Sequence, residues 1–285
     1  MRYRNEKVQV AVIVIDNGRI LLYSKRKSRE REFDMIGIYF SGTGNSKYAV
    51  EEFVKRFDAK AFSIEDSTVL EEIEKHKQIV FSYPVQYSTV PKILRDFIIE
   101  NKMLWNNKEV FIIATMGLFS GDGAGILGRL LEKYGAKVIG GLHLKMPDSI
   151  ADEKVLKNSQ DDNILLVRNA ERKIEKAVIA LKAGKPPKEG IGLLYHIAGL
   201  FGQRLYFGYK TKHYCKNIKI DAQKCVGCRK CEKLCPMKNL EFTDQRIEQN
   251  GTCTMCYRCV NHCPQKAITI LGKEVAEQSV IEKYL

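Results

Sequence analysis

The sequence lacks any apolar run as long as a membrane-spanning helix requires. Its apolar runs "VQVAVIVI" and "VFIIATM" stop far short of the roughly 18 residues needed to cross a bilayer. The opening stretch also lacks a signal-peptide pattern, because its short apolar core is followed by charged residues. We therefore expect no transmembrane segment, and we expect a cytoplasmic protein.

Cysteine is absent from the first 214 residues, and all nine cysteines lie in the remainder of the 285-residue chain. A disulfide scaffold is typical of short secreted chains, whereas crowded cysteines in a cytosolic protein indicate a metal centre. The chain is long enough for two domains. We therefore expect a metal-binding C-terminal part.

Nucleic-acid-binding motifs are also absent, although the formal net charge is +13. The excess is uneven: residues 191–285 hold fifteen Lys and Arg against eight Asp and Glu, and residues 1–34 hold nine against five. Such a surface can meet nucleic acid, an anionic membrane or an acidic protein. Without a motif we expect a solvated basic surface and no nucleic-acid partner.

The strongest signal in the chain is a duplicated cysteine run, C-x₂-C-x₂-C-x₃-C-P. Two intervening residues let three successive thiolates bind three corners of one iron–sulfur cube, and the proline then turns the chain away. The pattern predicts two [4Fe–4S] clusters, with structural zinc as the alternative, although zinc sites usually bring two separated C-x₂-C pairs. The two runs, offset by 28 residues, are Cys225, Cys228, Cys231, Cys235-Pro236 and Cys253, Cys256, Cys259, Cys263-Pro264.

This spacing resembles that of bacterial two-cluster ferredoxins, in which the fourth cysteine of each run binds the other cluster. The resemblance implies one cluster on Cys225, Cys228, Cys231 and Cys263. It implies a second cluster on Cys253, Cys256, Cys259 and Cys235. Crossed ligation would tie together a domain, residues 218–272, that has little core of its own. The ninth cysteine, Cys215, is expected to be a small buried side chain.

Between residues 35 and 185, apolar runs alternate with stretches of helical period. This alternation predicts a doubly wound α/β domain with a five-stranded parallel sheet. The expected strands are 36–40, 60–64, 78–84, 109–116 and 136–144, and the expected helices are 46–57, 67–76, 91–101, 123–135 and 161–184.

The remaining segments flank these two domains. Residues 1–34 form an N-terminal extension that reads as a β-hairpin turning at Asn17-Gly18. Residues 186–217 are a linker, and residues 273–285 are a tail. The apolar stretch within 191–214 is expected to pack between the domains, with a peripheral position on a membrane as the alternative.

A loop rich in glycine and hydroxyls, "FSGTGNSKYAV", joins the first sheet strand to the first helix. Backbone N–H groups converge at such a turn, where they bind anions. No lysine follows the glycines, so it is neither a Walker loop nor a G-x-G-x-x-G fingerprint. Hydroxyl donors without a cation suit the phosphate of flavin mononucleotide (FMN). The loop residues are Ser41, Gly42, Thr43, Gly44, Asn45 and Ser46.

This loop resembles the T/S-x-T-G-x-T/S phosphate loop of flavodoxins. Two further stretches, 82–91 and 114–125, match in position the flavodoxin loops that flank the isoalloxazine ring, at the carboxyl ends of strands. Gln86 and Tyr87 stand where that family often has an aromatic and then a small residue. A helix N-cap is the alternative role of Asp122. The ring contacts that the resemblance implies are Pro84, Val85, Gln86, Tyr87, Thr115, Met116, Gly117, Leu118, Phe119, Ser120, Gly121 and Asp122.

Residues 35–285 as a whole resemble the flavodoxin–ferredoxin fusion proteins of anaerobic bacteria and archaea. The resemblance implies a protein that relays electrons between two [4Fe–4S] clusters and FMN, and that meets a redox protein or a small electron acceptor. Reduction of a small acceptor would make it a reductase. No acid–base or nucleophilic triad is visible in the sequence, so the chemistry is assigned to the cofactors.

Two other functions remain open at this stage. One is a plain iron–sulfur carrier without a substrate of its own. The other is a carrier or sensory protein whose flavodoxin-like domain serves for docking and no longer binds flavin.

Overall fold

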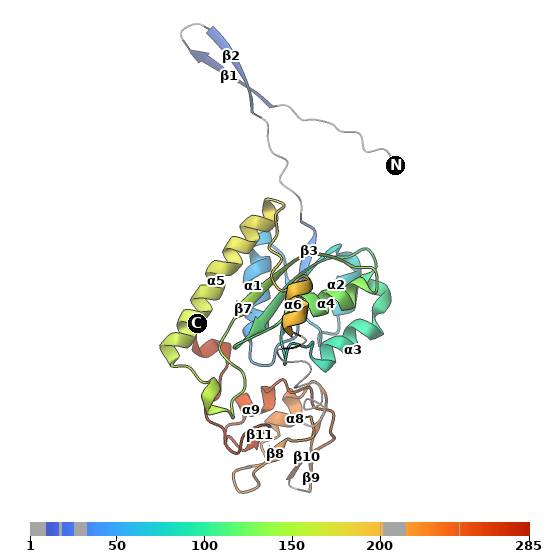
Figure 1. Ribbon diagram of the computed structural model, residues 1–285, viewed down its shortest axis with the longest axis vertical. Coiled ribbons are helices and arrows are strands. Elements are labelled where there is room, and N and C mark those ends of the chain that lie inside the picture. The colour runs from blue at the N-terminus through green and yellow to red at the C-terminus, as the bar shows by residue number, and fades with distance from the viewer. Residues whose placement is uncertain (1–9, 17–18, 26–32, 200, 202–214, 245) are drawn as a thin grey trace. The chain divides into compact units, whose positions relative to one another are not determined.

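The computed structural model describes residues 10–16, 19–25, 33–199, 201, 215–244 and 246–285, in two units that divide after residue 33 (Figure 1). In the first unit, β1 (Val10–Asp16) and β2 (Arg19–Lys25) pair antiparallel. The predicted turn at Asn17-Gly18 lies outside the described residues. No helix in the described ranges is long and apolar enough to cross a membrane.

A five-stranded parallel sheet forms the centre of the second unit (Figure 1). Its spatial order, β4-β3-β5-β6-β7, corresponds to 2-1-3-4-5 within the domain, which is the flavodoxin-like order. The predicted fold class is therefore confirmed. The strands are β3 (Met35–Tyr39), β4 (Ala61–Ser63), β5 (Gln78–Pro84), β6 (Glu109–Met116) and β7 (Lys137–Lys145). The helices are α1 (Asn45–Val54), α2 (Val69–Lys75), α3 (Lys92–Glu100), α4 (Gly123–Glu132) and α5 (Gln160–Lys182).

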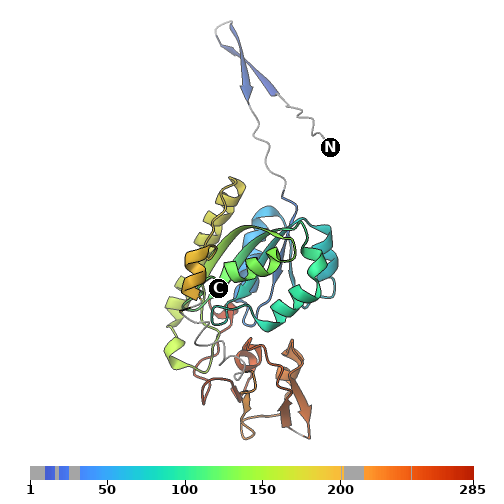
Figure 2. The ribbon, with the colours of Figure 1, turned by 45° about the vertical axis from the view of Figure 1, so that its right-hand side comes forward.

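Helices cover both faces of this sheet (Figures 1 and 2): α1 and α5 lie on one face, and α2, α3 and α4 on the other. On the first face, the ring of Phe53 in α1 stacks on Phe111 of β6 at 4.9 Å between centroids. On the second face, Ile36 and Ile38 of β3 join a core with the apolar side chains of α2, α3 and α4. Burial on both faces explains why the strands read as continuous apolar runs.

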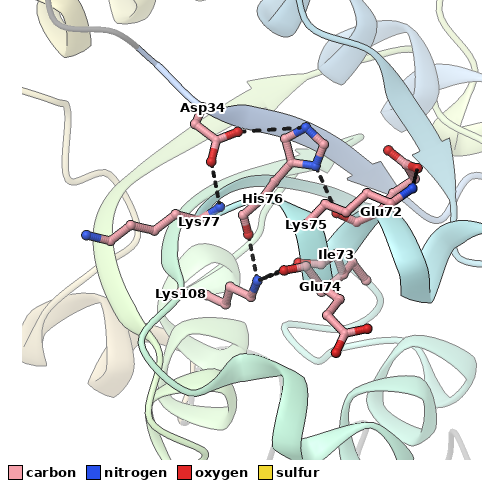
Figure 3. A network of polar contacts seen from close by, with 8 residues as sticks. All are labelled: Asp34, Glu72, Ile73, Glu74, Lys75, His76, Lys77 and Lys108. Atoms are coloured by element: carbon pink, nitrogen blue, oxygen red, sulfur yellow. Dashed lines mark hydrogen bonds and ion pairs between the residues drawn. The ribbon is translucent and has the colours of Figure 1, made fainter.

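The amino edge of the sheet is held by a polar network around Lys108 (Figure 3). The Lys108 ammonium donates to the carbonyl oxygens of Ile73, Glu74 and His76 at 2.5, 3.0 and 2.6 Å. These are carbonyls at the C-terminal end of α2, which have no partner inside the helix. The network ties the end of α2 to the start of β6. It lies at the amino ends of the strands, opposite the carboxyl ends where α/β sheets bind ligands.

The cysteine-rich part repeats its backbone as it repeats its sequence. Left-handed residues recur at the 28-residue offset, with φ of 65° and 55° at Gly227 and Met255 and of 58° and 60° at Arg229 and Tyr257. Across the repeats, β8 pairs with β11 and β9 with β10. The elements are β8 (Lys219–Ile220), α8 (Lys230–Leu234), β9 (Leu240–Thr243), β10 (Arg246–Gln249), α9 (Arg258–His262) and β11 (Ile268–Thr269).

The described part of the apolar segment after the sheet is α6 (Leu193–Gly199), which packs against α4 (Figure 1). His196 Nδ1 lies 3.1 Å from the Asp122 carboxylate at the start of α4. The segment was expected to pack between the domains, but its described helix α6 packs on α4 of the flavodoxin-like part. Residues 202–214 of that segment lie outside the described residues.

Candidate functional site

A cavity of about 320 Å³ opens at the carboxyl ends of the sheet strands. Its walls come from loops after β3, β5 and β6, so it lies at the point where the strand order reverses. Its volume is in the range of small-molecule sites. The predicted residues that line it are Ser41, Gly42, Thr43, Asn45, Ser46, Pro84, Val85, Gln86, Tyr87, Thr115, Met116, Gly117, Leu118 and Phe119.

The first loop combines a left-handed glycine with a very close backbone contact. Gly44 has φ of 92° immediately before α1, and its N–H donates to Ser41 Oγ at 3.1 Å. A Cβ on Gly42 would lie 1.9 Å from the carbonyl oxygen of Cys256. Glycine at position 42 therefore lets the loop meet the cysteine-rich part directly.

The hydroxyls of this loop are not equivalent. The Ser46 and Thr115 hydroxyls are 2.7 Å apart, and Thr115 Oγ1 donates in turn to the Tyr83 carbonyl at 3.3 Å. Because a hydroxyl carries one proton, Ser46 donates to Thr115 and ties α1 to β6. Ser41 Oγ accepts from Gly44, so its own proton stays available to a ligand. Thr43 and Ser46 were predicted as phosphate donors; with Ser46 bonded to Thr115, this geometry favours Ser41 over Ser46 for that role.

Asn45 shows what kind of ligand the cavity fits. Its Nδ2 donates to the Pro147 carbonyl at 2.8 Å, whereas its Oδ1 is buried without a hydrogen-bond partner among the described residues. A buried acceptor without a donor is costly, so this oxygen calls for a ligand hydroxyl or N–H. The cavity thus offers donors at the glycine-rich loop and an acceptor beside them.

The second loop makes a tight turn between the cavity and the cysteine-rich part. Tyr87 and Ser88 both have positive φ, 49° and 56°. Tyr87 lines the cavity, and the Gln86 amide donates to the carbonyls of Thr254 and Met255, each at 3.0 Å. Gln86, a departure from the usual flavodoxin wording, is therefore a contact to the second cysteine run.

The third loop divides into two parts. Residues Thr115 to Phe119 line the cavity, whereas Ser120, Gly121 and Asp122 lie outside its wall, as does Gly44. Ser120 Oγ lies 2.9 Å from His143 Nδ1, and Gly121 lies against α6. Asp122 is buried in an ion pair with Arg129. The end of this loop therefore serves packing around α4 and α6.

Sequence reasoning missed nine residues of the cavity wall. They come from two places: the stretch after β7 and the loops of the cysteine-rich part. Asp148 is half-buried there; burial raises the pKa of its carboxyl, and Oδ1 accepts from the Ile150 N–H at 2.8 Å. In the sequence, residues 146–149 ("MPDS") are close in wording to the fusion proteins that the chain resembles, but nothing local marked the others. The nine are Pro147, Asp148, Ser149, Ile150, Leu156, Met255, Cys256, Tyr257 and Leu271.

The eight repeated cysteines surround two smaller cavities in crossed sets. One cavity is lined by Cys225, Cys228, Cys231 and Cys263, and the other by Cys235, Cys253, Cys256 and Cys259. In each set the fourth thiol of one run joins the first three of the other, as the ferredoxin resemblance implies. Within the described ranges, no three His, Cys, Asp or Glu side chains converge closely enough to hold a single metal ion.

Most of these cysteines are buried or half-buried, with Cys228 exposed, and several of their sulfurs receive backbone donors. Burial raises the pKa of the thiols of Cys231 and Cys256 to about 11 and that of Cys253 to about 12. Metal ligation requires the thiolates, so loading iron here must release protons. The N–H groups of Asn239 and Ala267, four residues beyond Cys235 and Cys263, lie 3.2 and 3.3 Å from their sulfurs. If Cys235 and Cys263 bind clusters as thiolates, these two N–H groups would donate to their charged sulfurs.

Arg258 in α9 joins the two cofactor regions. It donates to the Ser41 carbonyl at 2.8 Å and to both carboxylate oxygens of Glu65 at 2.7 and 2.8 Å. Bidentate pairing of this kind fixes orientation as well as distance. Asn261, one turn further along α9, donates to the Ser149 carbonyl at 2.8 Å. The second cysteine run is thereby held against the cavity.

Asp152, in the stretch after β7, is the most heavily bonded group of this contact. One carboxylate oxygen accepts from the N–H groups of Ile270, Leu271 and Gly272 at 2.6, 2.9 and 3.1 Å. The other accepts from the Tyr257 hydroxyl at 2.9 Å. Four donors to one buried carboxylate make it a strong anchor.

The C-terminal tail closes the same contact from the other side. Gln278 donates to the carbonyls of Val260 and Cys263 at 2.9 and 2.7 Å. Further on, the Ile281 N–H donates to the Thr43 carbonyl at 2.9 Å. The tail therefore runs from α9 to the glycine-rich loop and binds both.

Comparison with known proteins supports the iron–sulfur part. Residues 217–264 match the profile of a family described as a 4Fe-4S dicluster domain. This supports at least one [4Fe–4S] cluster in the protein. No curated protein matches the chain.

Solved structures similar to this chain include three flavodoxins. That of Megasphaera elsdenii is 25% identical over 40% of this chain and 88% of its own, with a TM-score of 0.35. Flavodoxin 2 of Bacillus cereus is 16% identical over 53% and 98%, with a TM-score of 0.39. The FMN-bound Fusobacterium nucleatum flavodoxin is 19% identical over 52% and 97%, with a TM-score of 0.34.

An iron–sulfur domain joined to a flavodoxin-like sheet is the composition of an electron-transfer protein. Most of the predicted flavin-loop residues and the second cysteine run gather at the junction of these two parts. The three loops of the sheet and the second cysteine run share one cavity wall.

Replacing Asp152 with Asn should loosen this junction. The asparagine side chain has only one acceptor oxygen, so either the Tyr257 hydroxyl or the backbone N–H groups of residues 270–272 lose their acceptor. We expect backbone amides 270–272 to exchange hydrogen at least tenfold faster, measured by mass spectrometry on the cluster-loaded protein. Asp161→Asn, an exposed change at the start of α5, is the matched control. Equal exchange in the two variants would show that Asp152 is not an anchor.

Proposed function

We propose that this protein relays electrons within one chain between two [4Fe–4S] clusters and an FMN bound in the 320 Å³ cavity. The observation that carries the proposal is the shared wall of that cavity. Cys256, a predicted ligand of the second cluster, and its neighbours Met255 and Tyr257 line the cavity together with the glycine-rich loop. No separate encounter between domains is then needed.

The cavity residues fit FMN. Ser41, Thr43 and the backbone N–H groups of the glycine-rich loop would hold its phosphate. The orphaned Asn45 Oδ1 would accept from a ribityl hydroxyl, and the loops around Tyr87 and Met116 would hold the ring. A cluster supplies one-electron transfer and FMN supplies one- or two-electron transfer, so their pairing converts single electrons into pairs.

The two cysteine sets differ in their distance from this cavity. The set that contains Cys256 is proximal, because Cys256 lines the FMN cavity itself. The set that contains Cys228 is distal, and Cys228 is exposed. Ferredoxin-type clusters have low potentials, so electrons enter at the distal cluster, pass the proximal one and leave through FMN. The acceptor is a small molecule or a second protein.

Rapid mixing with dithionite tests the relay. In the anaerobically reconstituted protein, cluster absorbance should bleach first and flavin absorbance later, because the clusters are the entry point. The flavin rate should not depend on protein concentration. A flavin rate proportional to protein concentration would mean transfer between molecules. Absence of flavin from the protein would favour an iron–sulfur carrier with an empty docking domain.

The crossed ligation has its own test in Cys235→Ala. Because Cys235 faces the cavity of Cys253, Cys256 and Cys259, its loss should damage the proximal cluster and spare the distal one. EPR of the reduced variant, with iron analysis, measures which signal is lost. Cys263→Ala is the matched control and should damage the distal cluster. Damage to the cluster nearer in sequence in both variants would refute crossing.

Thr43→Ala tests phosphate recognition. A hydrogen bond to a charged group contributes about 1.5–3 kcal/mol, so FMN affinity should fall at least about tenfold, since 1.4 kcal/mol is one decade. Riboflavin, which has no phosphate, should bind the variant as it binds the native protein. Ser46→Ala is made alone and together with Thr43→Ala. Because Ser46 is bonded to Thr115, its loss should weaken the binding of FMN and riboflavin by the same factor. Equal loss of FMN and riboflavin in Thr43→Ala would assign Thr43 to the fold alone.

A further inference from the structure

The two cysteine runs have the same backbone but very different surroundings. The second run is covered by the flavodoxin-like part: Tyr257 is 2% exposed, and Thr254 is 4% exposed. At the equivalent positions of the first run, the Arg229 side chain is 53% exposed and Val226 is 64% exposed. One run is therefore docked inside the chain, whereas these positions of its counterpart are exposed in the described part of the structure.

Positive charge replaces the docking residues on the uncovered face. Lys230 stands where Arg258 binds Glu65, and Lys233 stands where Asn261 binds Ser149. Both lysines are exposed, and because they are three apart on α8 they lie on the same side of that helix. In the described part of the chain, no carboxylate lies within ion-pair distance of either lysine. Arg229, beside them, pairs with Glu232 at 2.8 Å.

The same face carries the edge of the distal cluster site. Val226, Arg229 and Lys230 line the cavity of Cys225, Cys228, Cys231 and Cys263, and Cys228 is itself exposed. A partner seated on this face would therefore lie against a predicted cluster ligand. Exposed apolar surface at the centre with cations around it is the composition of an electrostatically steered interface.

Resting on the relay proposed above, we propose that this basic face (Val226, Cys228, Arg229, Lys230 and Lys233) is the docking site of an acidic one-electron carrier protein. The carrier occupies, on the first run, the position that the flavodoxin-like part occupies on the second. Its carboxylates pair with Lys230 and Lys233 as Glu65 pairs with Arg258. One electron leaves the reduced carrier and reduces the distal cluster by one electron, with no bond formed or broken.

Charge reversal at both lysines tests the proposal. The probe is chemically reduced, acidic plant-type [2Fe–2S] ferredoxin, mixed with the reconstituted full chain at ionic strengths from 10 to 300 mM. For the native protein, the second-order rate of cluster reduction should fall as salt rises, because opposite charges attract over a Debye length of about 30 Å at 10 mM and under 8 Å at the upper end. In K230E/K233E the low-salt rate should fall at least tenfold, and the salt dependence should flatten or reverse.

A second readout does not depend on electron transfer. Calorimetry of the oxidised ferredoxin with the oxidised protein should show a Kd at least tenfold higher for K230E/K233E. K133E/K137E carries the same change in net charge at the amino edge of the sheet and is the control. K230Q/K233Q should lie between K230E/K233E and the native protein.

The outcomes separate this proposal from the relay. Equal losses in K230E/K233E and K133E/K137E would mean that only net charge matters, and the docking site would be refuted. Because Lys230 lines the distal cavity, iron content and dithionite reduction are measured for every variant. If K230E/K233E has lost its distal cluster, the rates and affinities of K230Q/K233Q decide the test. Failure of flavin to follow the clusters after dithionite would refute the relay while leaving the docking result standing.

Discussion

The backbone contact between two loops, residues 40–44 and 255–257, is the constraint on which the rest of this structure depends. A single methyl group on Gly42 would meet the Cys256 carbonyl oxygen at 1.9 Å. The glycine-rich loop and the loop that carries Cys256 are therefore in direct contact, with no layer of side chains between them at this point. Arg258 fixes that contact through Ser41, a residue 217 positions away in the sequence. Both loops line the 320 Å³ cavity, so its wall is complete only when both are folded.

The internal repeat explains the two crossed sets of cysteines, but it does not explain the asymmetry between them. The backbone repeats at the 28-residue offset, down to left-handed residues at Lys238 and Lys266 with φ of 48° and 50°. Ligand spacing fixes this shared backbone. The residues between the ligands then differ: a tyrosine that bonds to Asp152 in one run corresponds to an exposed arginine in the other. The repeated cysteines thus determine the ligand sets, and the residues that differ between the two runs determine which run docks on the flavodoxin-like part.

The sheet was predictable from sequence because its signals are local. Each strand is a short apolar run, each helix has its own period, and the strand order follows once the glycine-rich loop is placed after the first strand. The three loops at the carboxyl edge were found for the same reason. Local signals could not show that Ser46 is bonded to Thr115 or that Asp122 is buried against Arg129, because those partners are set by packing.

The junction was less predictable, because its residues are ordinary in sequence and special only in their contacts. Asp152 resembles any loop aspartate until the 270–272 amides are placed around it. Ile281 in the tail carries no motif, yet its N–H binds the carbonyl of Thr43. The linker was predicted from its apolar character to join the domains, but its described part, α6, packs on α4. Apolar character predicts burial, not the surface that provides it.

Shared packing also bears on how the two parts move. Ala151, from the stretch after β7, is fully buried in the core of the cysteine-rich part, and Tyr87 and Ile150 pack against that core. Residues 34–285 accordingly form one compact unit. Two domains that share a core cannot separate without exposing it, which costs roughly 25 cal/mol for each Å² of apolar surface. In the proposed relay, transfer inside the chain would therefore proceed at a fixed distance, and the one step left to diffusion would be the encounter with an outside partner. Long-range charge accelerates only a diffusional step. It is therefore physically consistent that the internal junction relies on short hydrogen bonds and paired ions, whereas Lys230 and Lys233 on the outer face of the first run have no ion-pair partner among the described residues.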